Sequence, residues 1–372
     1  MSGKLAGKKI WIDVEQPKTA IMFNSLFRKF QEEGAELLIT ARDYDSTYKI
    51  LEDNKVKHIK VGAHGGARLI DKLYTYIDRL SQLLPHVEKF NPDHFVTFSS
   101  IEGARIAYGL GIPSIGINDE PRNVPVCKLL FPFLDKIITA ECIPIESYIK
   151  YHADRERIVR YNGLDEIAWI SEYKPNPNIL RDYLGQFDLE KGKFIIMRSE
   201  PSLACYLIDK LKPEETLISQ LLPPLLSKFP DYKYLLLVRT SEQEQFLRKE
   251  LEQHANNENV FITQYLPYIV DLCFYSALVI SGGGTIVRES SLLSVPSIEY
   301  FPGDSAPQET FLLDSGFPLH HIRDPEKIVN RALEILEKGP SSNRFNLSFK
   351  EKIAHFENPI EICFNMVKER LS

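Results

Sequence analysis

The chain has 372 residues, of which 44% are hydrophobic and 11% aromatic. That is enough apolar material for two cores, so two domains are predicted. The net charge of −6 argues against a nucleic-acid groove or a patch for anionic membranes, since both need clustered basic residues. The five cysteines are scattered and never spaced as CxxC, which argues against a disulfide framework or a zinc site.

The beginning of the chain, "MSGKLAGKKIWIDV", passes from basic residues into a short strand without the apolar core of a signal peptide. No run of about 18 apolar residues occurs anywhere, so no integral membrane segment is predicted. The expected protein is soluble and cytoplasmic.

Strand-length apolar runs alternate with helical periodicity along the whole chain, the pattern of parallel βαβ units, so the fold class is α/β. In the first half the predicted strands are "KIWIDV", "ELLITA", "VKHIKV", "HFVTFS", "PSIGIN", "KIITA" and "RIVRY", and the clearest helices are "FNSLFRKFQEEG" and "LIDKLYTYIDRLSQLLPHVEKF". Residues 163–192 break the rhythm with prolines, charges and glycines and are interpreted as a linker. Strands resume with "KFIIM", "KYLLLV", "NVFIT", "ALVIS" and "PSIEYF".

An internal echo supports two domains of like construction. Residues 95–115, "FVTFSSIEGARIAYGLGIPSI", align without a gap with residues 278–298, "LVISGGGTIVRESSLLSVPSI". Both read as strand, turn, helix and strand, and both end in "PSI". The echo places the three glycines at the carboxyl end of a strand, the edge where open α/β sheets bind ligands.

The glycines in "SGGGT" leave the N-terminus of the following helix unobstructed, and an anion such as phosphate is the expected ligand. A tight turn or close packing is the alternative. No GxxxxGK[ST] or GxGxxG pattern occurs, so the usual signatures of ATP hydrolysis and hydride transfer are missing. Glu289 follows on the same helix and is a candidate for a ribose diol, the alternative being a solvated surface acid.

Strand ends of the first domain are expected to supply the acceptor side and any general base. The candidates are Asp13, Glu15, Asp43, His64, Asp119 and Glu120. His64 suits proton transfer, with an exposed loop histidine as the alternative. Asp119 and Glu120 are either a base pair for catalysis or the N-cap and first turn of the next helix. For His320 and His321, ordinary packing is favoured over catalysis.

No metal constellation is present, since the chain has no DxD at a strand end, no HExxH and no histidines at ligand spacing. No metal and no cofactor are therefore predicted. Phosphate charge is expected to be neutralised by helix N-termini and arginines.

Several segments of the sequence resemble segments of known protein families. The segment from "NVFITQYLPYI" through "SGGGTIVRES" to "APQETFLLDSGF" resembles the nucleotide-binding half of GT-B glycosyltransferases and of non-hydrolysing UDP-N-acetylglucosamine 2-epimerases. The whole chain, through "IWIDVEQPK", "TARDY", "HGG", "GLGIPSIGIND" and "YNG", resembles a prokaryotic, largely archaeal family of unknown function related to both. The resemblance implies a GT-B-like fold of two Rossmann-like domains facing a cleft. They would comprise residues 1–170, with a C-terminal helix at about 357–372 packing back on them, and residues 171–356.

The resemblance assigns roles to individual residues. Gly283 and Gly284 match the loop at the donor phosphates, Glu289 the ribose-binding acid, and Gln308 a glutamine on the donor sugar. Leu266 falls where the uracil ring is held. The predicted nucleotide-sugar site thus contains Arg198, Ser199, Leu266, Gly282, Gly283, Gly284, Thr285, Glu289 and Gln308. The predicted catalytic set, chosen for its position at the strand ends of the first domain, contains His64, Asp119, Glu120 and Asp13.

The sequence also departs from its relatives. "VEQPKTA" replaces the glycine-rich first loop of the transferase, and the paired carboxylates of the epimerase are not found at their expected strand ends. The leading hypothesis is a metal-independent UDP-sugar glycosyltransferase acting on an unidentified acceptor. A sugar 2-epimerase and a non-catalytic nucleotide-sugar-binding protein remain as alternatives.

Overall fold

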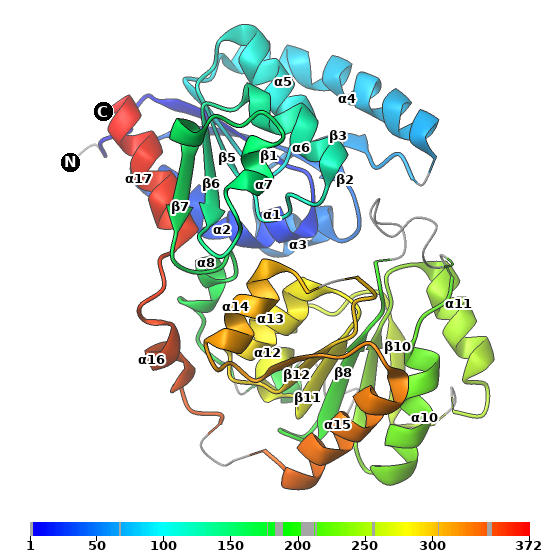
Figure 1. Cartoon of the computed structure of the whole chain (residues 1–372). Helices are drawn as coiled ribbons and strands as arrows, with labels where there is room; N and C mark the ends of the chain where they lie inside the picture. Colours follow the sequence, from blue (N-terminus) through cyan, green and yellow to red (C-terminus); the bar gives the residue numbers. More distant parts are fainter. Residues whose placement is uncertain are drawn as a thin grey trace. The chain divides into compact units, whose positions relative to one another are not determined.

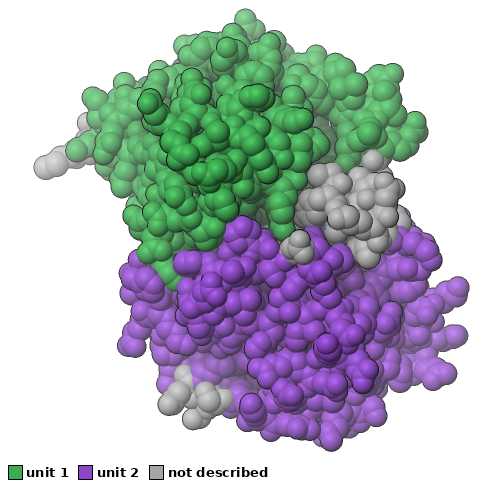
Figure 2. Space-filling view, in the orientation of Figure 1, with its two compact units in different colours: residues 1–169, 356–372 green, residues 170–355 purple. Residues whose placement is uncertain are grey.

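The computed structural model describes residues 3–66, 68–176, 178–182, 189–201, 212, 214–254, 257–303, 305–340 and 344–372. The chain divides into two compact units, residues 1–169 with 356–372 (unit 1) and residues 170–355 (unit 2), coloured separately in Figure 2. Residues 177 and 183–188 of the segment interpreted as a linker lie outside the described residues.

Unit 1 is built on a parallel sheet of seven strands in the order β3-β2-β1-β4-β5-β6-β7 (Figure 1). All seven strands predicted from the first half of the sequence are present. They are β1 (Lys9–Val14), β2 (Glu36–Asp43), β3 (Ile59–Ala63), β4 (His94–Thr97), β5 (Ser114–Ile117), β6 (Lys136–Ala140) and β7 (Ile158–Tyr161). Most of their side chains are buried, as expected for strands with helices on both faces.

The helices of unit 1 form a layer on each face of the sheet. The helices that follow β1 and β2 in the chain form one layer, and those that follow β3, β4 and β5 form the other. The helices are α1 (Pro17–Met22), α2 (Asn24–Glu32), α3 (Thr47–Asp53), α4 (Leu69–Phe90), α5 (Ile101–Leu110), α6 (Val124–Leu130), α7 (Glu146–Ile149), α8 (Ile167–Ile170) and the 3₁₀ turns η1 (Phe131–Phe133) and η2 (Arg155–Arg157). The last helix, α17 (Pro359–Leu371), packs on α2 and beside β6, so the end of the chain belongs to this unit.

Unit 2 repeats the design with a parallel sheet of six strands in the order β10-β9-β8-β11-β12-β13. The strands are β8 (Phe194–Arg198), β9 (Lys233–Leu237), β10 (Val260–Thr263), β11 (Leu278–Ser281), β12 (Ser297–Glu299) and β13 (Leu319–His321). Its helices are α9 (Ile179–Asp182), α10 (Ile218–Lys228), α11 (Ser241–Glu250), α12 (Ile269–Tyr275), α13 (Gly284–Leu292), α14 (Pro307–Asp314), α15 (Pro325–Lys338) and α16 (Phe349–Ile353). The predicted α/β class with two Rossmann-like domains is confirmed.

The echo in the sequence corresponds to equivalent places in the two sheets. β4 and β11 each lie beside the first strand of their sheet, and β5 and β12 each lie next to them. The helices that follow begin at aligned N-caps, Ser100 and Gly283. Ser100 caps α5 by accepting a hydrogen bond from the N–H of Gly103, whereas Gly283 brings no side chain to α13. Among the residues that the structure describes, unit 1 therefore caps this helix with a hydroxyl, whereas unit 2 brings no side-chain cap to it.

No helix in the described ranges is long and apolar enough to cross a membrane.

Candidate functional site

At each of Gly282, Gly283 and Gly284 a side chain would meet a different neighbour. A Cβ atom on Gly282 would lie 2.9 Å from Cα and 3.0 Å from the backbone nitrogen of Glu200. Backbone cannot yield as a flexible side chain can, so this glycine allows the loop after β11 to pack on the loop after β8. For Gly282 the close-packing alternative is the one that the contacts support.

Gly283 lies under a guanidinium group. A Cβ atom at this position would be 2.8 Å from Nη2 of Arg239. Arg239 follows β9, and its Nε donates to the carbonyl oxygen of Ser199 at 3.1 Å. Its own N–H donates to Oε1 of Gln243, also at 3.1 Å. A cation is therefore held against the open N-terminus of α13, two positive features that an anion can satisfy together.

Gly284 lies against a buried ion pair. Its Cβ atom would be 2.6 Å from Oε1 of Glu309 and 2.7 Å from Nη1 of Arg288. These two side chains, from α14 and α13, are joined at 2.8 Å and are almost completely buried. Burial raises the pKa of Glu309 and the charge of Arg288 opposes that rise. The pair fixes α14 to α13 just behind the loop.

Arg239 was not among the residues singled out from the sequence. Its only signal is a basic residue directly after the predicted strand "KYLLLV". The predicted Ser199 explains how Arg239 is held, because Ser199 is fully buried and its hydroxyl donates to Oε1 of Gln243 at 2.7 Å. Ser199 therefore positions the arginine rather than offering its own hydroxyl to solvent. Arg198 is the last residue of β8, and Thr285 is partly exposed in the first turn of α13.

Three other predicted residues of unit 2 are buried. Glu289 is 3% exposed, Gln308 3% and Leu266 6%. Burial and then the charge of Glu289 raise the pKa of the Cys273 thiol, which places Glu289 near α12. The interpretation of Glu289 as a solvated surface acid is therefore wrong. Its role on a ribose stays a prediction.

The two adjacent histidines of β13 have different polar partners. The Nδ1 atom of His321 lies 2.9 Å from Oε2 of Glu299, at the end of β12. His320 contacts Arg331 through Nε2, and burial followed by the charge of Arg331 lowers the pKa of His320. Both histidines are thus tied to neighbouring elements of unit 2.

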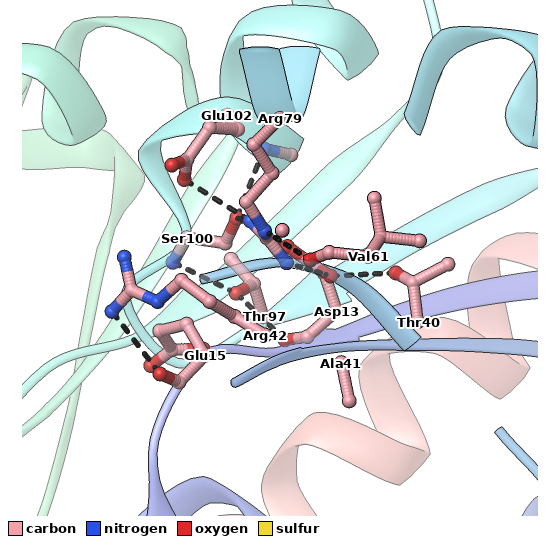
Figure 3. A network of polar contacts seen from close by, with 12 residues as sticks. Asp13, Glu15, Thr40, Ala41, Arg42, Val61, Arg79, Thr97, Ser100 and Glu102 are labelled. Atoms are coloured by element: carbon pink, nitrogen blue, oxygen red, sulfur yellow. Dashed lines mark hydrogen bonds and ion pairs between the residues drawn. The ribbon is translucent and has the colours of Figure 1, made fainter. Parts of the chain in front are cut away.

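In unit 1, the predicted catalytic residue Asp13 is the centre of a buried polar network (Figure 3). Asp13 has no exposed surface, and its carboxylate accepts from the hydroxyls of Thr40 and Ser100 and from Nη2 of Arg79 at 2.8 Å. Arg79 also donates to Glu102 at 3.1 Å. With these contacts Asp13 joins β1 to β2, α4 and the start of α5, an arrangement that favours a structural role.

Glu15 lies two residues further along and has an unusual environment. Its Oε1 accepts from the hydroxyl of Thr19 at 2.9 Å and from the N–H of Ser99 at 3.1 Å. Its Oε2 is buried, and no described residue forms a hydrogen bond with it. Burial, and next the charge of Asp13, raise the pKa of Glu15 to about 7. Glu15 is thus a carboxyl group that can take up or release a proton near neutral pH.

A lysine gathers three carboxylates at the same edge of this sheet. Nζ of Lys18 forms ion pairs with Asp119 and, at 2.8 Å, with Asp165, and it lies 3.9 Å from Glu166. Tyr161 donates its hydroxyl to Asp165. Burial raises the pKa of Asp165 to about 6, against the lowering effect of Lys18. Lys18, Asp165 and Glu166 were missed because they are distant from Asp119 in the sequence.

Asp119 and Glu120 are adjacent in the chain but have different partners. Glu120 forms an ion pair with Arg122, with 2.6 Å between Oε2 and Nη2, and both side chains are partly exposed. The N-cap of α6 is Asn123, so the interpretation of Asp119 as a helix N-cap is wrong. The side chains of Asp119 and Lys18 are each 11% exposed, which leaves the pair a narrow access to solvent.

His64 lies apart from this cluster, beside Arg42 and Tyr44. Its ring is 4.6 Å from that of Tyr44, and its Nδ1 accepts from the N–H of Gly66 at 3.1 Å. Burial and then the charge of Arg42 lower the pKa of His64 to about 4. At neutral pH the ring is therefore uncharged with its Nδ1 lone pair occupied, which suits a hydrogen-bond donor at Nε2 better than a general base. Among the described residues, no three His, Cys, Asp or Glu side chains are grouped as metal ligands.

Comparison with known proteins completes this description. A family model, "Protein of unknown function (DUF354)", matches residues 8–372. The chain belongs to this family. It is also 25% identical over 365 residues to the "Uncharacterized protein MJ0665" of Methanocaldococcus jannaschii, covering 96% of this chain and 97% of that protein. The resemblance inferred from the sequence is confirmed.

Solved structures share the fold at low sequence identity. The UDP-GlcNAc 2-epimerase of Neisseria meningitidis bound to UDP-GlcNAc has a TM-score of 0.70 and 14% identity, covering 98% of this chain and 99% of that one. The M. jannaschii UDP-GlcNAc 2-epimerase in complex with UDP-GlcNAc and UDP gives 0.68 and 15%, covering 97% and 99%. The glycotransferase of kitacinnamycin gives 0.61 and 12%, covering 99% and 100%. The family therefore has the fold of GT-B glycosyltransferases and UDP-GlcNAc 2-epimerases.

Proposed function

We propose that the protein binds a nucleotide sugar, a UDP-sugar in the first instance, with the diphosphate at the glycine loop of unit 2. The observation that carries this proposal is the guanidinium of Arg239 held against Gly283 at the uncapped start of α13. The helix end supplies N–H donors and a partial positive charge, and Arg239 supplies a full one. Diphosphate charge is neutralised there without a metal ion.

The proposed reaction is transfer of the sugar to an acceptor hydroxyl, with the nucleoside diphosphate as leaving group. The helix N-terminus and Arg239 stabilise the charge that develops on the departing diphosphate. A unit 1 carboxylate accepts the acceptor proton. Asp119 is the first candidate, because it forms an ion pair with Lys18 and its side chain keeps some access to solvent.

A second candidate function, isomerisation at C2 of the nucleotide sugar, is favoured by a specific observation. In such an isomerisation a base removes the proton from C2 while the bond from C1 to the UDP oxygen breaks, and a proton then returns to C2 as UDP adds back to C1. Asp165, with a pKa of about 6, and Glu15, with a pKa of about 7, are carboxyl groups suited to exchange protons near neutral pH. The sequence alone had not supplied acids for this chemistry.

Ligand binding is the first test. Thermal stability should rise with UDP and UDP-sugars, because a ligand at 100 times its dissociation constant adds about 2.7 kcal/mol to folding stability. Arg239→Gln should reduce the shift, while Arg248→Gln, on the exposed face of α11, should leave it unchanged. If uridine, guanosine and thymidine diphosphate sugars all fail to stabilise the wild-type protein, both candidate functions are wrong.

Product analysis then separates the two reactions. Transfer should release UDP only when an acceptor is added. Isomerisation should proceed without an acceptor and, in deuterated water, should place deuterium on C2 of the recovered sugar. Binding without either reaction would support a nucleotide-sugar-binding protein instead.

A further inference from the structure

A cavity of about 400 Å³ lies in unit 2 at the end of the sheet opposite the glycine loop. Ala277, Pro296 and Pro318 line it, and each directly precedes a strand, β11, β12 or β13. The glycine loop follows the carboxyl end of β11, so the cavity and the loop lie at opposite ends of the same strand. The cavity therefore belongs to neither the proposed diphosphate site nor the carboxylates of unit 1.

The lining of this cavity is basic and half apolar. Arg344 and Lys352 are cations, and Ser294, Ser348 and Tyr232 bring hydroxyl groups. None of its lining residues in the described chain is acidic. Ile335 and Leu336 of α15 join the prolines in the apolar part. Such a mixture of apolar wall and few polar groups is typical of a site for a small organic molecule.

Arg344 lines the cavity, and in the part of the chain that the structure describes its guanidinium has no carboxylate partner but lies 4.4 Å from the centre of the Phe345 ring. Its Nη1 donates to the carbonyl of Ala277 at 3.3 Å and its Nη2 to that of Ser276, so the two nitrogens hold the turn between α12 and β11. These bonds leave Nε, which is buried and has no hydrogen-bond partner among the residues that the structure describes. Burial lowers the pKa of Arg344 to about 10, because a partly buried positive charge is less well hydrated than one in water.

Ser294 is a second polar group in the same condition. Its hydroxyl oxygen is buried and finds no hydrogen-bond partner in the described parts of the chain, and its backbone has a φ of 63° between α13 and β12. Arg344 and Ser294 come from different segments and line one cavity. An oxyanion in the cavity would supply acceptors for both and would balance the charge of Arg344.

We propose that this cavity is a binding site for a small organic anion, with a carboxylate or phosphate group at Arg344 and Ser294 and an apolar body against Leu336 and the prolines. The site is separate from the proposed nucleotide-sugar site and does not depend on it. Lys352, at the exposed end of α16, adds a second positive charge.

The test measures binding of three compounds to the full-length protein: phenyl phosphate, benzoate and benzyl alcohol. Each carries one phenyl ring, and they differ in the polar group. Calorimetric titration should show binding of at least one anion and not of the alcohol, and saturating UDP should not displace it. The preference between phosphate and carboxylate identifies the head group. Arg344→Met and Ser348→Trp, which narrows the cavity from an exposed position, should each reduce affinity at least tenfold. Arg248→Gln is the matched control.

Four results would overturn the proposal. They are no binding of either anion up to 10 mM, equal binding of the alcohol, displacement by UDP, or unchanged affinity in the variants. Should Arg344→Met fail to fold because the turn between α12 and β11 loses its hydrogen bonds, Ser348→Trp and Lys352→Met decide, since both residues are exposed. Because UDP binding is measured separately, loss of the proposed function would leave this result standing, and the reverse also holds.

Discussion

Nη2 of Arg239 lies only 2.8 Å from the position that a Cβ atom on Gly283 would occupy. A side chain at Gly283 would therefore push the guanidinium away from the start of α13. We expect Gly283→Ala and Arg239→Gln each to weaken UDP binding by about 10- to 150-fold, the equivalent of one charge-assisted hydrogen bond of about 1.5 to 3 kcal/mol. Titration calorimetry measures both. Because they disturb one interaction, the double variant should lose less than the sum of the two.

Gly282 should behave differently from its neighbour. A Cβ atom there meets the backbone of Glu200 at 2.9 Å, and backbone must move to admit it. Gly282→Ala should therefore lower the free energy of unfolding by about 1 to 3 kcal/mol, the usual cost of overpacking. Thermal or denaturant unfolding measures this. A fully stable Gly282→Ala protein would contradict the packing argument.

Strands β1 to β12 and the division into two like-built units could be predicted because the information is local. Apolar runs mark the strands, and the echo between residues 95–115 and 278–298 gives two units of one design. The site is different. Lys18 pairs with Asp165, 147 positions away, and no periodic pattern links two such residues. Asp13 was predicted to be catalytic only because it lies at a strand end. Its burial depends on Arg79, which comes from a helix 66 positions away.

The Asp13–Arg79 pair makes a prediction about stability. Both side chains have no exposed surface, and Arg79 also bonds the carbonyl of Val61. Asp13→Ala would leave a buried guanidinium with part of its charge uncompensated, which typically costs about 3 to 5 kcal/mol. Glu120→Gln, on a partly exposed pair, should change stability by less than about 0.5 kcal/mol. If Asp13→Ala unfolds like wild type but is inactive, Asp13 is a catalytic residue after all.

Glu15 predicts a specific dependence of stability on pH. Its pKa rises from 4.5 to about 7 on folding, so the folded protein retains a proton that the unfolded chain releases between these values. The contribution of Glu15 is therefore complete below about pH 4.5 and is lost as the pH rises through about 7. Glu15→Gln stays neutral at every pH. Relative to wild type, its free energy of unfolding should increase from pH 4.5 to pH 8, and a constant difference would show that Glu15 ionises normally.

Glu289 gives the sharpest test of the nucleotide site. It lies on α13 beyond the glycine loop and is only 3% exposed, so its carboxylate is mostly dehydrated and benefits from each donor it meets. If it accepts from the 2′ and 3′ hydroxyls of a ribose, Glu289→Gln replaces one acceptor by a donor and should weaken UDP binding about 10- to 150-fold. The 2′,3′-dideoxy analogue of UDP lacks those hydroxyls. Wild type should strongly prefer UDP to the analogue, and the variant should nearly lose that preference, whereas Glu258→Gln, in an exposed loop, should keep it.

The contrary outcome is a Glu289→Gln protein that is less stable yet discriminates between UDP and the analogue as well as wild type. That result would assign Glu289 to the packing of α13 against α12, because a structural role affects folding and leaves the choice between the two ligands unchanged.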